Sequence, residues 1–382
     1  MIFHVGEREI DTQKIRRWVN SSRGRTIAFW AAPPAVLIML FTLWSVFGPS
    51  TGRTNDDGSR VVLYTSADDY VVAAVVEAFK AETGIRVDVV TDTEATRGSV
   101  AQRVLAEKDK PRGDVWWASE VLTSVGLAEQ RALAAWSTRA EATMAGGWPR
   151  NLRPADSRWY GFAQRGRVIA YSTRAFANKN LVPTRLRDLT KPEFRGKVGI
   201  ANPRFGTTRT HLAYLVATHG AAPVQQWLRE MVDNGLKVLP SNSAVVQALA
   251  QGDIIVGLTD TDDVWAGQAQ QWPVDLVYEA PDRPREKFVG LPSPGPLLIP
   301  NTVGRMVGSP NAIAGDKLAD FLLSEKVEKF LAESTSRNIP IRPDLAKKYP
   351  AIAVANEAPV DWTQVARHEV QALQIADAVL PK

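Results

Sequence analysis

Most of this sequence alternates between short apolar runs and longer amphipathic runs. Residues 61–66 and 87–90 are rich in β-branched residues, and a helical pattern over residues 71–83 lies between them and ends at Gly84. Parallel strands need a long crossover connection, which is usually a helix. A helix between these two strands therefore favours a parallel pair. The same alternation continues through the middle of the chain, so the sequence predicts an α/β fold.

Carboxylates follow the ends of four predicted strands. Ligands of open α/β sheets bind just beyond the carboxyl ends of the strands, and the ends of parallel strands meet at one edge. Carboxylate oxygens suit a hard cation, so we predict a cation site at this edge. Helix capping is the alternative for each residue, since Asp is a favoured N-cap. The candidate cation ligands are Asp68, Glu94, Glu120, Asp260, Asp262 and Asp263.

Two other motifs favour anions. A Gly-Thr-Thr sequence at residues 206–208 and a Ser-Asn-Ser sequence at residues 241–243 each precede a predicted helix, where free amides and hydroxyls attract negative charge. Simple capping explains either motif equally, and neither is a P-loop or a dinucleotide fingerprint. Nearby arginines either neutralise the carboxylates or hold an oxyanion, with surface solvation as the alternative. The candidate anion or ligand contacts are Thr207, Thr208, Asn242, Arg165 and Arg204.

The amino-terminal part has a different pattern. Residues 1–25 hold six Lys or Arg against three acids, and residues 26–52 carry no charge. Residues 26–47 would span about 33 Å as a helix, enough for a hydrocarbon core of about 30 Å. We expect a single-pass transmembrane anchor at residues 26–48, with a long signal segment as the alternative. The basic tail then stays in the cytoplasm, and the main domain is extracytoplasmic, that is, periplasmic.

Composition excludes several classes of protein. At 382 residues and 45% hydrophobic composition, the chain can bury one or two substantial cores. Residues 1–25 account for +3 of the +5 net charge, and there is no basic stripe with interleaved aromatics, which argues against nucleic-acid binding. The absence of cysteine excludes thiolate metal sites, and the four histidines are too scattered for a zinc motif. With no catalytic constellation, we predict a protein that is not an enzyme and has no catalytic cofactor.

Six short sequence motifs occur in a characteristic order: residues 61–66, 79–85, 113–117, 188–198, 252–253 and 297–302. In this order they resemble the extracellular (periplasmic) solute-binding proteins of ABC importers, most closely the ferric-iron-binding branch. The likeness runs from about Val61 to about Pro343. It implies a two-lobed periplasmic-binding-protein fold, type II-like, here with an N-terminal transmembrane helix. The expected parts are a cytoplasmic tail (1–25), the anchor (26–48), a flexible tether (49–59), lobe 1 (60–157 plus 293–345), lobe 2 (158–292) and a C-terminal helical tail (346–382).

The resemblance also implies a ligand. Asp262 and Asp263 take the places of two adjacent tyrosines of the family, Asp68 that of a histidine, and Glu120 that of a glutamate. Asp260 takes the place of an asparagine that often helps to hold a synergistic anion, and Thr207, Thr208 and Asn242 fall near the family's other anion contacts. The implied function is capture of iron(III) or a related metal ion, with such an anion, by a monomeric protein that delivers it to an ABC permease and its ATPase.

Several alternatives stay open at this stage. Without phenolates at the paired aspartates, other hard cations, a polyamine, or an oxyanion such as phosphate, sulfate or phosphonate suit the same residues. An alternative of another class is a membrane-anchored metal-dependent hydrolase, and a further one is an extracytoplasmic sensor.

Overall fold

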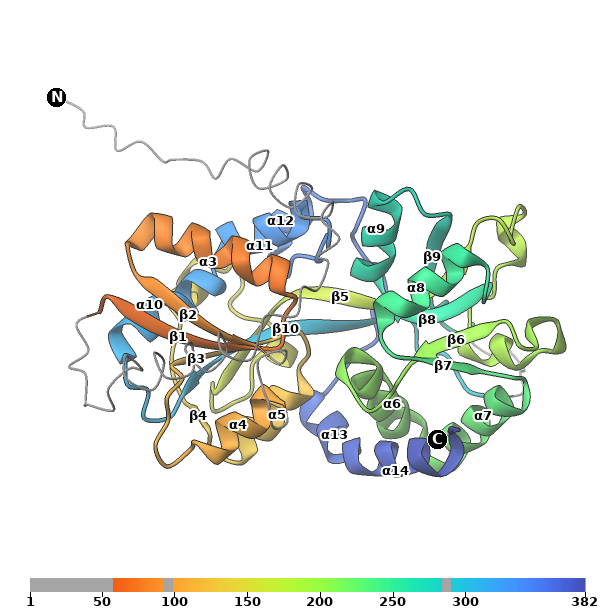
Figure 1. Cartoon of the computed structure of the whole chain (residues 1–382), viewed down its shortest axis with the longest axis horizontal. Helices are drawn as coiled ribbons and strands as arrows, with labels where there is room; N and C mark the ends of the chain where they lie inside the picture. The colour runs from red at the N-terminus through yellow and green to blue at the C-terminus, as the bar shows by residue number, and fades with distance from the viewer. Residues whose placement is uncertain (1–57, 92–98, 284–289, 382) are drawn as a thin grey trace, which may run out of the picture.

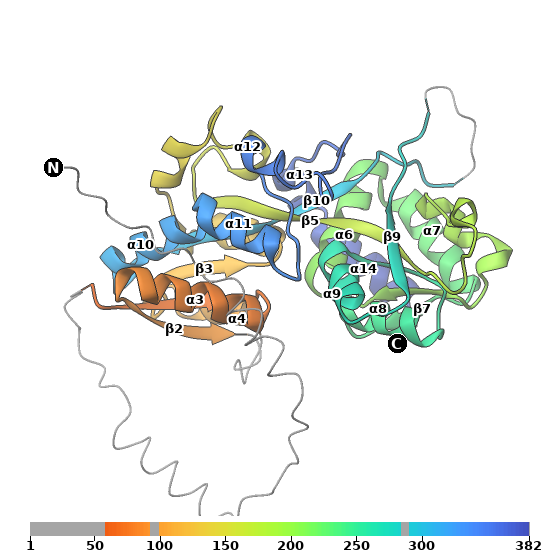
Figure 2. The same cartoon turned by 90° about the horizontal axis from the view of Figure 1, so that it is seen from above.

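The computed structural model describes residues 58–91, 99–283 and 290–381. The expected tail, anchor and most of the tether therefore lie outside the described residues, as does Glu94. The described chain forms two α/β lobes side by side, joined by two long strands that run from one lobe into the other (Figure 1). Figure 2 shows these two strands, β5 and β10, at the centre of the molecule.

The first lobe is built on parallel strands β1, β2 and β3. β1 pairs with both neighbours in parallel, and β3 pairs with β10 in antiparallel orientation. Helix α3 crosses between β1 and β2, as its apolar spacing predicts, and ends at Gly84, whose φ of +73° suits glycine. The bounds in this lobe are β1 Arg60–Thr65, α3 Asp69–Thr83, β2 Arg86–Thr91, α4 Val100–Ala106, β3 Val115–Ala118, α5 Leu122–Glu129, β4 Leu133–Ala134, β10 Leu297–Met306, α10 Ala312–Leu322, α11 Glu325–Glu333 and α12 Pro343–Ala346.

The second lobe continues the same hydrogen-bonded sheet. The strand order across the molecule is β2-β1-β3-β10-β5-β8-β6-β7, with β9 pairing on β5. β5 is buried along its whole length, because its first half pairs with β10 and its second half with β8. The bounds in this lobe are β5 Trp159–Ser172, β6 Val198–Ala201, α6 Gly206–His219, α7 Ala221–Asp233, β7 Lys237–Leu239, α8 Asn242–Gln251, β8 Val256–Asp260, α9 Thr261–Ala269 and β9 Val274–Tyr278.

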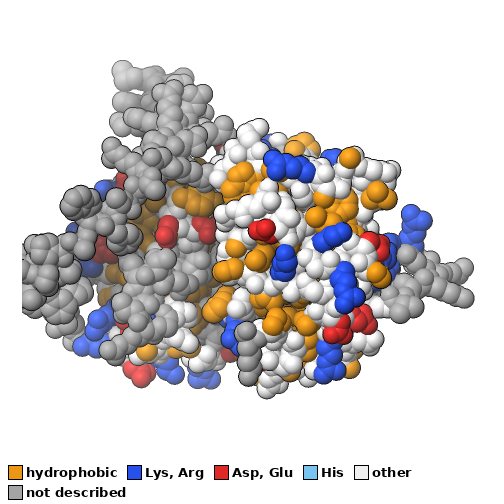
Figure 3. All heavy atoms as spheres, turned by 45° about the vertical axis from the view of Figure 1, so that its right-hand side comes forward, with side chains coloured by type: hydrophobic (Ala, Val, Ile, Leu, Met, Phe, Trp, Pro, Cys, Tyr) orange, Lys and Arg blue, Asp and Glu red, His pale blue; other side chains and the backbone are white. Residues whose placement is uncertain are grey.

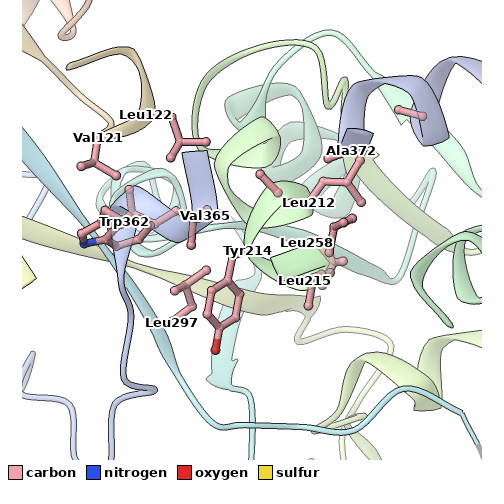
Figure 4. Packing of buried hydrophobic residues seen from close by; sticks show 14 of the residues in the cluster. Val121, Leu122, Leu212, Tyr214, Leu215, Leu258, Leu297, Trp362, Val365 and Ala372 are labelled. Carbon is pink, nitrogen blue, oxygen red and sulfur yellow. The ribbon is translucent and has the colours of Figure 1, made fainter. Parts of the chain in front are cut away.

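The C-terminal segment forms two helices, the first of which touches both lobes. α13 (Trp362–Arg367) packs on α5 and on α6, and α14 (Glu369–Val379) packs on α6 and α7. Trp362 is buried among Val121 and Leu122 of the first lobe and Tyr214 of the second (Figure 4). One apolar cluster therefore continues across the boundary between the lobes on this side of the molecule.

Two further observations bear on the predictions made from the sequence. Within the described residues, none of the helices combines the length and the apolar composition that a bilayer crossing requires. On the face shown in Figure 3, the coloured lysines and arginines are scattered among hydrophobic and acidic side chains rather than gathered in one stripe.

Candidate functional site

The acidic residues of the β8–α9 connection lie close together. Asp260 ends β8 and is the N-cap residue of α9, while Asp262 and Asp263 lie in its first turn. One carboxylate oxygen from each of these three residues lies within 4.8 Å of the others; we call them the acidic cluster. Under the capping alternative that the sequence left open, Asp262 or Asp263 would cap a helix running from Val264. The helix instead begins at Thr261, and the Asp260 side chain makes no capping hydrogen bond.

Asp260 is held in a buried polar network. It lies directly opposite Arg167 in the antiparallel β5–β8 pair, and the Arg167 guanidinium Nη1 is 2.8 Å from Asp260 Oδ1. Asn242 Nδ2 donates to Asp260 Oδ2 at 2.8 Å, and the Thr207 hydroxyl donates to the same oxygen. Thr208 in turn donates to Asn242 Oδ1 at 3.1 Å. Both oxygens of Asp260 are thus engaged, and the two donors to Oδ2, Asn242 and Thr207, are residues that the sequence assigned to an anion.

Only one of the two carboxylate oxygens of Asp262 has a partner. Arg165 Nη1 lies 3.0 Å from Asp262 Oδ2, and the two side chains are 10% and 6% exposed. The other oxygen, Oδ1, is buried and accepts no hydrogen bond from another residue. Burial raises the pKa of Asp262 to about 6, against the opposing charge of Arg165. A buried carboxylate oxygen without a partner is costly unless something else satisfies it, so Asp262 Oδ1 is a candidate ligand atom for a cation.

Asp263 shares this environment. Burial raises the pKa of its carboxyl well above the ordinary value, and the negative charges of Asp262, Asp260 and Asp68 raise it further. When several carboxylates lie close together, their mutual repulsion favours keeping a proton on one of them. A bound cation removes this repulsion by neutralising the carboxylates.

Asp68 and Tyr70 of the first lobe lie within electrostatic reach of the acidic cluster. Asp68 is the N-cap residue of α3 and, like Asp260, makes no capping hydrogen bond with its side chain. The Tyr70 hydroxyl lies 2.6 Å from Ser336 Oγ. Burial and the charge of Asp68 raise the pKa of Tyr70 to about 12, and the charge of Asp262 adds to this effect. Tyr70 thus lies within electrostatic reach of the acidic cluster in the other lobe.

The sequence interpretation did not include Tyr70 or Arg167. Tyr70 directly follows Asp68-Asp69, and its place in the first turn of the helix after β1 was an available signal. Arg167 lies two residues after Arg165 on β5, so the period-two spacing of a strand puts both on the same face. The acidic cluster with Asp68 brings four carboxylates against these two arginines, an excess of negative charge that favours a cation.

Glu120 lies at a different contact between the lobes. Its carboxylate accepts hydrogen bonds from the backbone amides of Leu122 and Thr123 at the start of α5, at 2.7 and 3.0 Å. It also accepts from Arg209 Nη2 at 3.1 Å and Thr210 Oγ1 at 3.0 Å, both on α6. The structure therefore uses Glu120 as a helix cap and a link between lobes, and does not bring it into the acidic cluster.

Arg204 is also outside the cluster. It lies ahead of α6 and forms an ion pair with Asp377 of α14 at 2.6 Å, with both side chains more than half exposed. Although Arg204 is three residues before Thr207 in the sequence, its guanidinium pairs with α14 and not with the acidic cluster.

The architecture and the site together define a class of protein. Two α/β lobes joined by crossing strands, with a polar site that receives side chains from both lobes, form the periplasmic-binding-protein fold. Residues 134–366 match the model of the bacterial extracellular solute-binding protein family, and the chain belongs to that family.

Relatives and neighbours agree with this assignment. The major ferric iron-binding protein of Neisseria meningitidis is 25% identical over 312 residues, which cover 81% of this chain and 89% of that protein. Iron uptake protein A2 of Synechocystis is 28% identical over 207 residues, 52% of this chain and 58% of that protein. Among solved structures, iron-bound HitA from Pseudomonas aeruginosa has a TM-score of 0.70 at 19% identity, covering 84% of this chain and 99% of that one. The apo ferric ion-binding protein A of Pasteurella haemolytica has a TM-score of 0.71 at 18% identity, with coverage of 84% and 98%.

Proposed function

We propose that this protein captures iron(III), or a related hard metal ion, between its lobes and delivers it to an ABC permease and its ATPase. The observation that carries the proposal is the excess of carboxylates at the acidic cluster, with Asp262 Oδ1 buried and vacant. The names of the relatives, which describe ferric iron binding and iron uptake, support iron as the cargo.

The proposed ligand set is drawn from both lobes. Asp262 and Asp263 offer carboxylate oxygens from the second lobe, and Asp68 offers one from the first. Tyr70 offers a phenol oxygen, which becomes a strong ligand for a trivalent ion once the ion displaces its proton. Hard cations prefer oxygen ligands of these kinds. An ion held by ligands from both lobes binds the closed arrangement of the lobes more tightly than the open one. The bound ion therefore favours closure.

We extend the proposal to the location and the parts of the chain. The uncharged segment at residues 26–48 is proposed as a single-pass anchor, with the two lobes on the periplasmic side and residues 49–59 as a tether. The lobe boundaries 60–157 plus 293–345 and 158–292 follow the crossings at β5 and β10. A monomer without catalytic activity is proposed.

Isothermal titration of the full-length chain with Fe(III), Mn(II), a polyamine and phosphate tests the function. We expect tight binding of Fe(III), and loss of that binding in Asp262→Ala and Asp263→Ala. Asp253→Ala is the matched control, because Asp253 lies in the same lobe but is exposed. Binding of the polyamine or phosphate without any metal ion would replace iron as the cargo, and metal-dependent hydrolysis of phosphate esters would favour the hydrolase.

A further inference from the structure

Asp260 differs from its neighbours in the acidic cluster because its surroundings are those of a bound anion. Its carboxylate receives three side-chain donors: Arg167, Asn242 and Thr207. These come from β5, from the first residue of α8 and from the first turn of α6, so three separate elements converge on one carboxylate. We call these three donors the cradle.

Two of the three cradle donors, Thr207 and Asn242, belong to motifs that the sequence predicts as anion contacts. Gly-Thr-Thr before one helix and Ser-Asn-Ser before another are typical of oxyanion contacts. In the structure, the donors of both motifs point at a single anion, and that anion is a side chain of the protein. Asp260 is 1% exposed and Arg167 is 3% exposed, so water does not compete for these contacts.

Among the described residues, the cavity that borders the cradle at Arg167 is small and mostly apolar. Arg167 still has two buried nitrogens, Nε and Nη2, without hydrogen-bond partners. The cavity that Arg167 lines has a volume of about 20 Å³ and is otherwise lined mostly by apolar side chains, among them Ile200, Leu212 and Leu258. That volume holds about one water molecule.

We propose that Asp260 is a built-in anion: it fills the cradle, so that the protein binds its cation without phosphate, carbonate or an external carboxylate at this position. This inference rests on the proposed capture of a metal ion. Asp260 acts as a positioning residue, since it neutralises Arg167 and fixes the start of α9, which carries Asp262 and Asp263.

Removing the side chain tests the proposal without any metal. In the full-length, metal-free chain, Asp260→Ala leaves the cradle donors facing an empty space of carboxylate size. Formate, which has the size of the lost carboxylate, is expected to bind there and raise the thermal midpoint of Asp260→Ala by about 2 °C or more over chloride at equal ionic strength. The wild-type midpoint is expected to be the same in the two salts. Asp260→Asn is the matched control, because it keeps the side-chain volume and leaves no space for formate.

Two results would overturn the proposal. One is an Asp260→Ala variant that responds to formate no more than Asp260→Asn does. The other is wild-type protein that binds phosphate by titration and loses this binding in Arg167→Met. The second result is decisive even if Asp260→Ala does not fold.

The metal supplies a separate readout. Wild-type affinity for Fe(III) is expected to be equal with and without phosphate or formate, whereas Asp260→Ala is expected to bind at least about tenfold more weakly and to recover when formate is added. Phosphate-dependent Fe(III) binding by the wild type would overturn the role of Asp260. Failure of the wild type to bind any metal would refute the proposed function, and the unfolding experiment would still decide the role of Asp260.

Discussion

Asp262→Asn is expected to stabilise the metal-free protein at neutral pH and, at the same time, to abolish metal binding. Burial raises the pKa of Asp262 to about 6, although Arg165 lies 3.0 Å away. The loss of hydration therefore outweighs the attraction to the arginine, and the ionised carboxylate is held at a net cost. An amide of the same shape removes that cost and also removes the charge that attracts a cation.

The magnitude follows from the pKa shift. The ordinary pKa is 3.8, so the folded protein keeps a proton between about pH 4 and pH 6 that the unfolded chain has lost. The contribution of Asp262 to stability is therefore greatest at low pH, falls as pH rises to about 6 and is constant above. About two pKa units correspond to about 3 kcal/mol, which is the most that Asp262→Asn can gain at pH 7.5 through this effect.

Urea unfolding of the metal-free protein at about pH 4.5 and pH 7.5 measures this gain. The variant is expected to be more stable than the wild type at the higher pH, with most of the difference gone at the lower pH. Asp253→Asn, an exposed acid of the same lobe, is the control and is expected to change stability little at either pH. A loss of about 3 to 5 kcal/mol at pH 7.5 would refute the reasoning, because that is the cost of breaking a buried ion pair that is net favourable.

Three further outcomes are expected. Tyr70→Phe should weaken Fe(III) binding at least about tenfold and remove any visible phenolate-to-iron absorption; an unchanged spectrum would exclude Tyr70 as a ligand. Glu120→Gln should weaken the link to Arg209 and increase the radius of gyration of the metal-free protein in solution scattering; no change would show that the apolar contacts alone hold the lobes together. Burial raises the pKa of Glu279 to about 7, so stability from this group falls as pH rises from about 4.5 to 7. Glu279→Gln should therefore be more stable than the wild type at about pH 8 and nearly equal at pH 5 by urea unfolding, whereas equal stability at both would contradict a burial penalty.

Much of the fold is readable from local pattern. The strand at residues 61–66, the helix ending at Gly84 and the next strand all appear within one or two residues of their predicted places. The spacing of apolar residues and the position of glycine predict these elements, because the elements depend on neighbours within one or two helical turns. The two-lobed arrangement came from the resemblance to a family, and the structural neighbours share that fold.

The site was less accessible from sequence. The three carboxylates of the acidic cluster are neighbours in the chain, so their proximity was predictable. The hydrogen-bonding environments of Asp260 and Glu120 were not predictable, because each depends on donors from distant segments. These donors are Arg167 and Asn242 for Asp260, and Arg209 for Glu120. Tyr70 was missed for the same reason, since its relation to Asp262 exists only across the lobes.

The sequence alone determined the order of strands and helices, the acidic strand ends and the donor-rich helix starts, since these follow from side-chain type and spacing. Only the tertiary structure decided which carboxylates are satisfied and which are vacant. Burial and pairing depend on what packs against a side chain, and the antiparallel register of β5 with β8 puts Arg167 opposite Asp260. The predicted anion contacts Thr207 and Asn242 thus hold a carboxylate of the chain itself, and Asp262 has one buried oxygen without a hydrogen-bond partner.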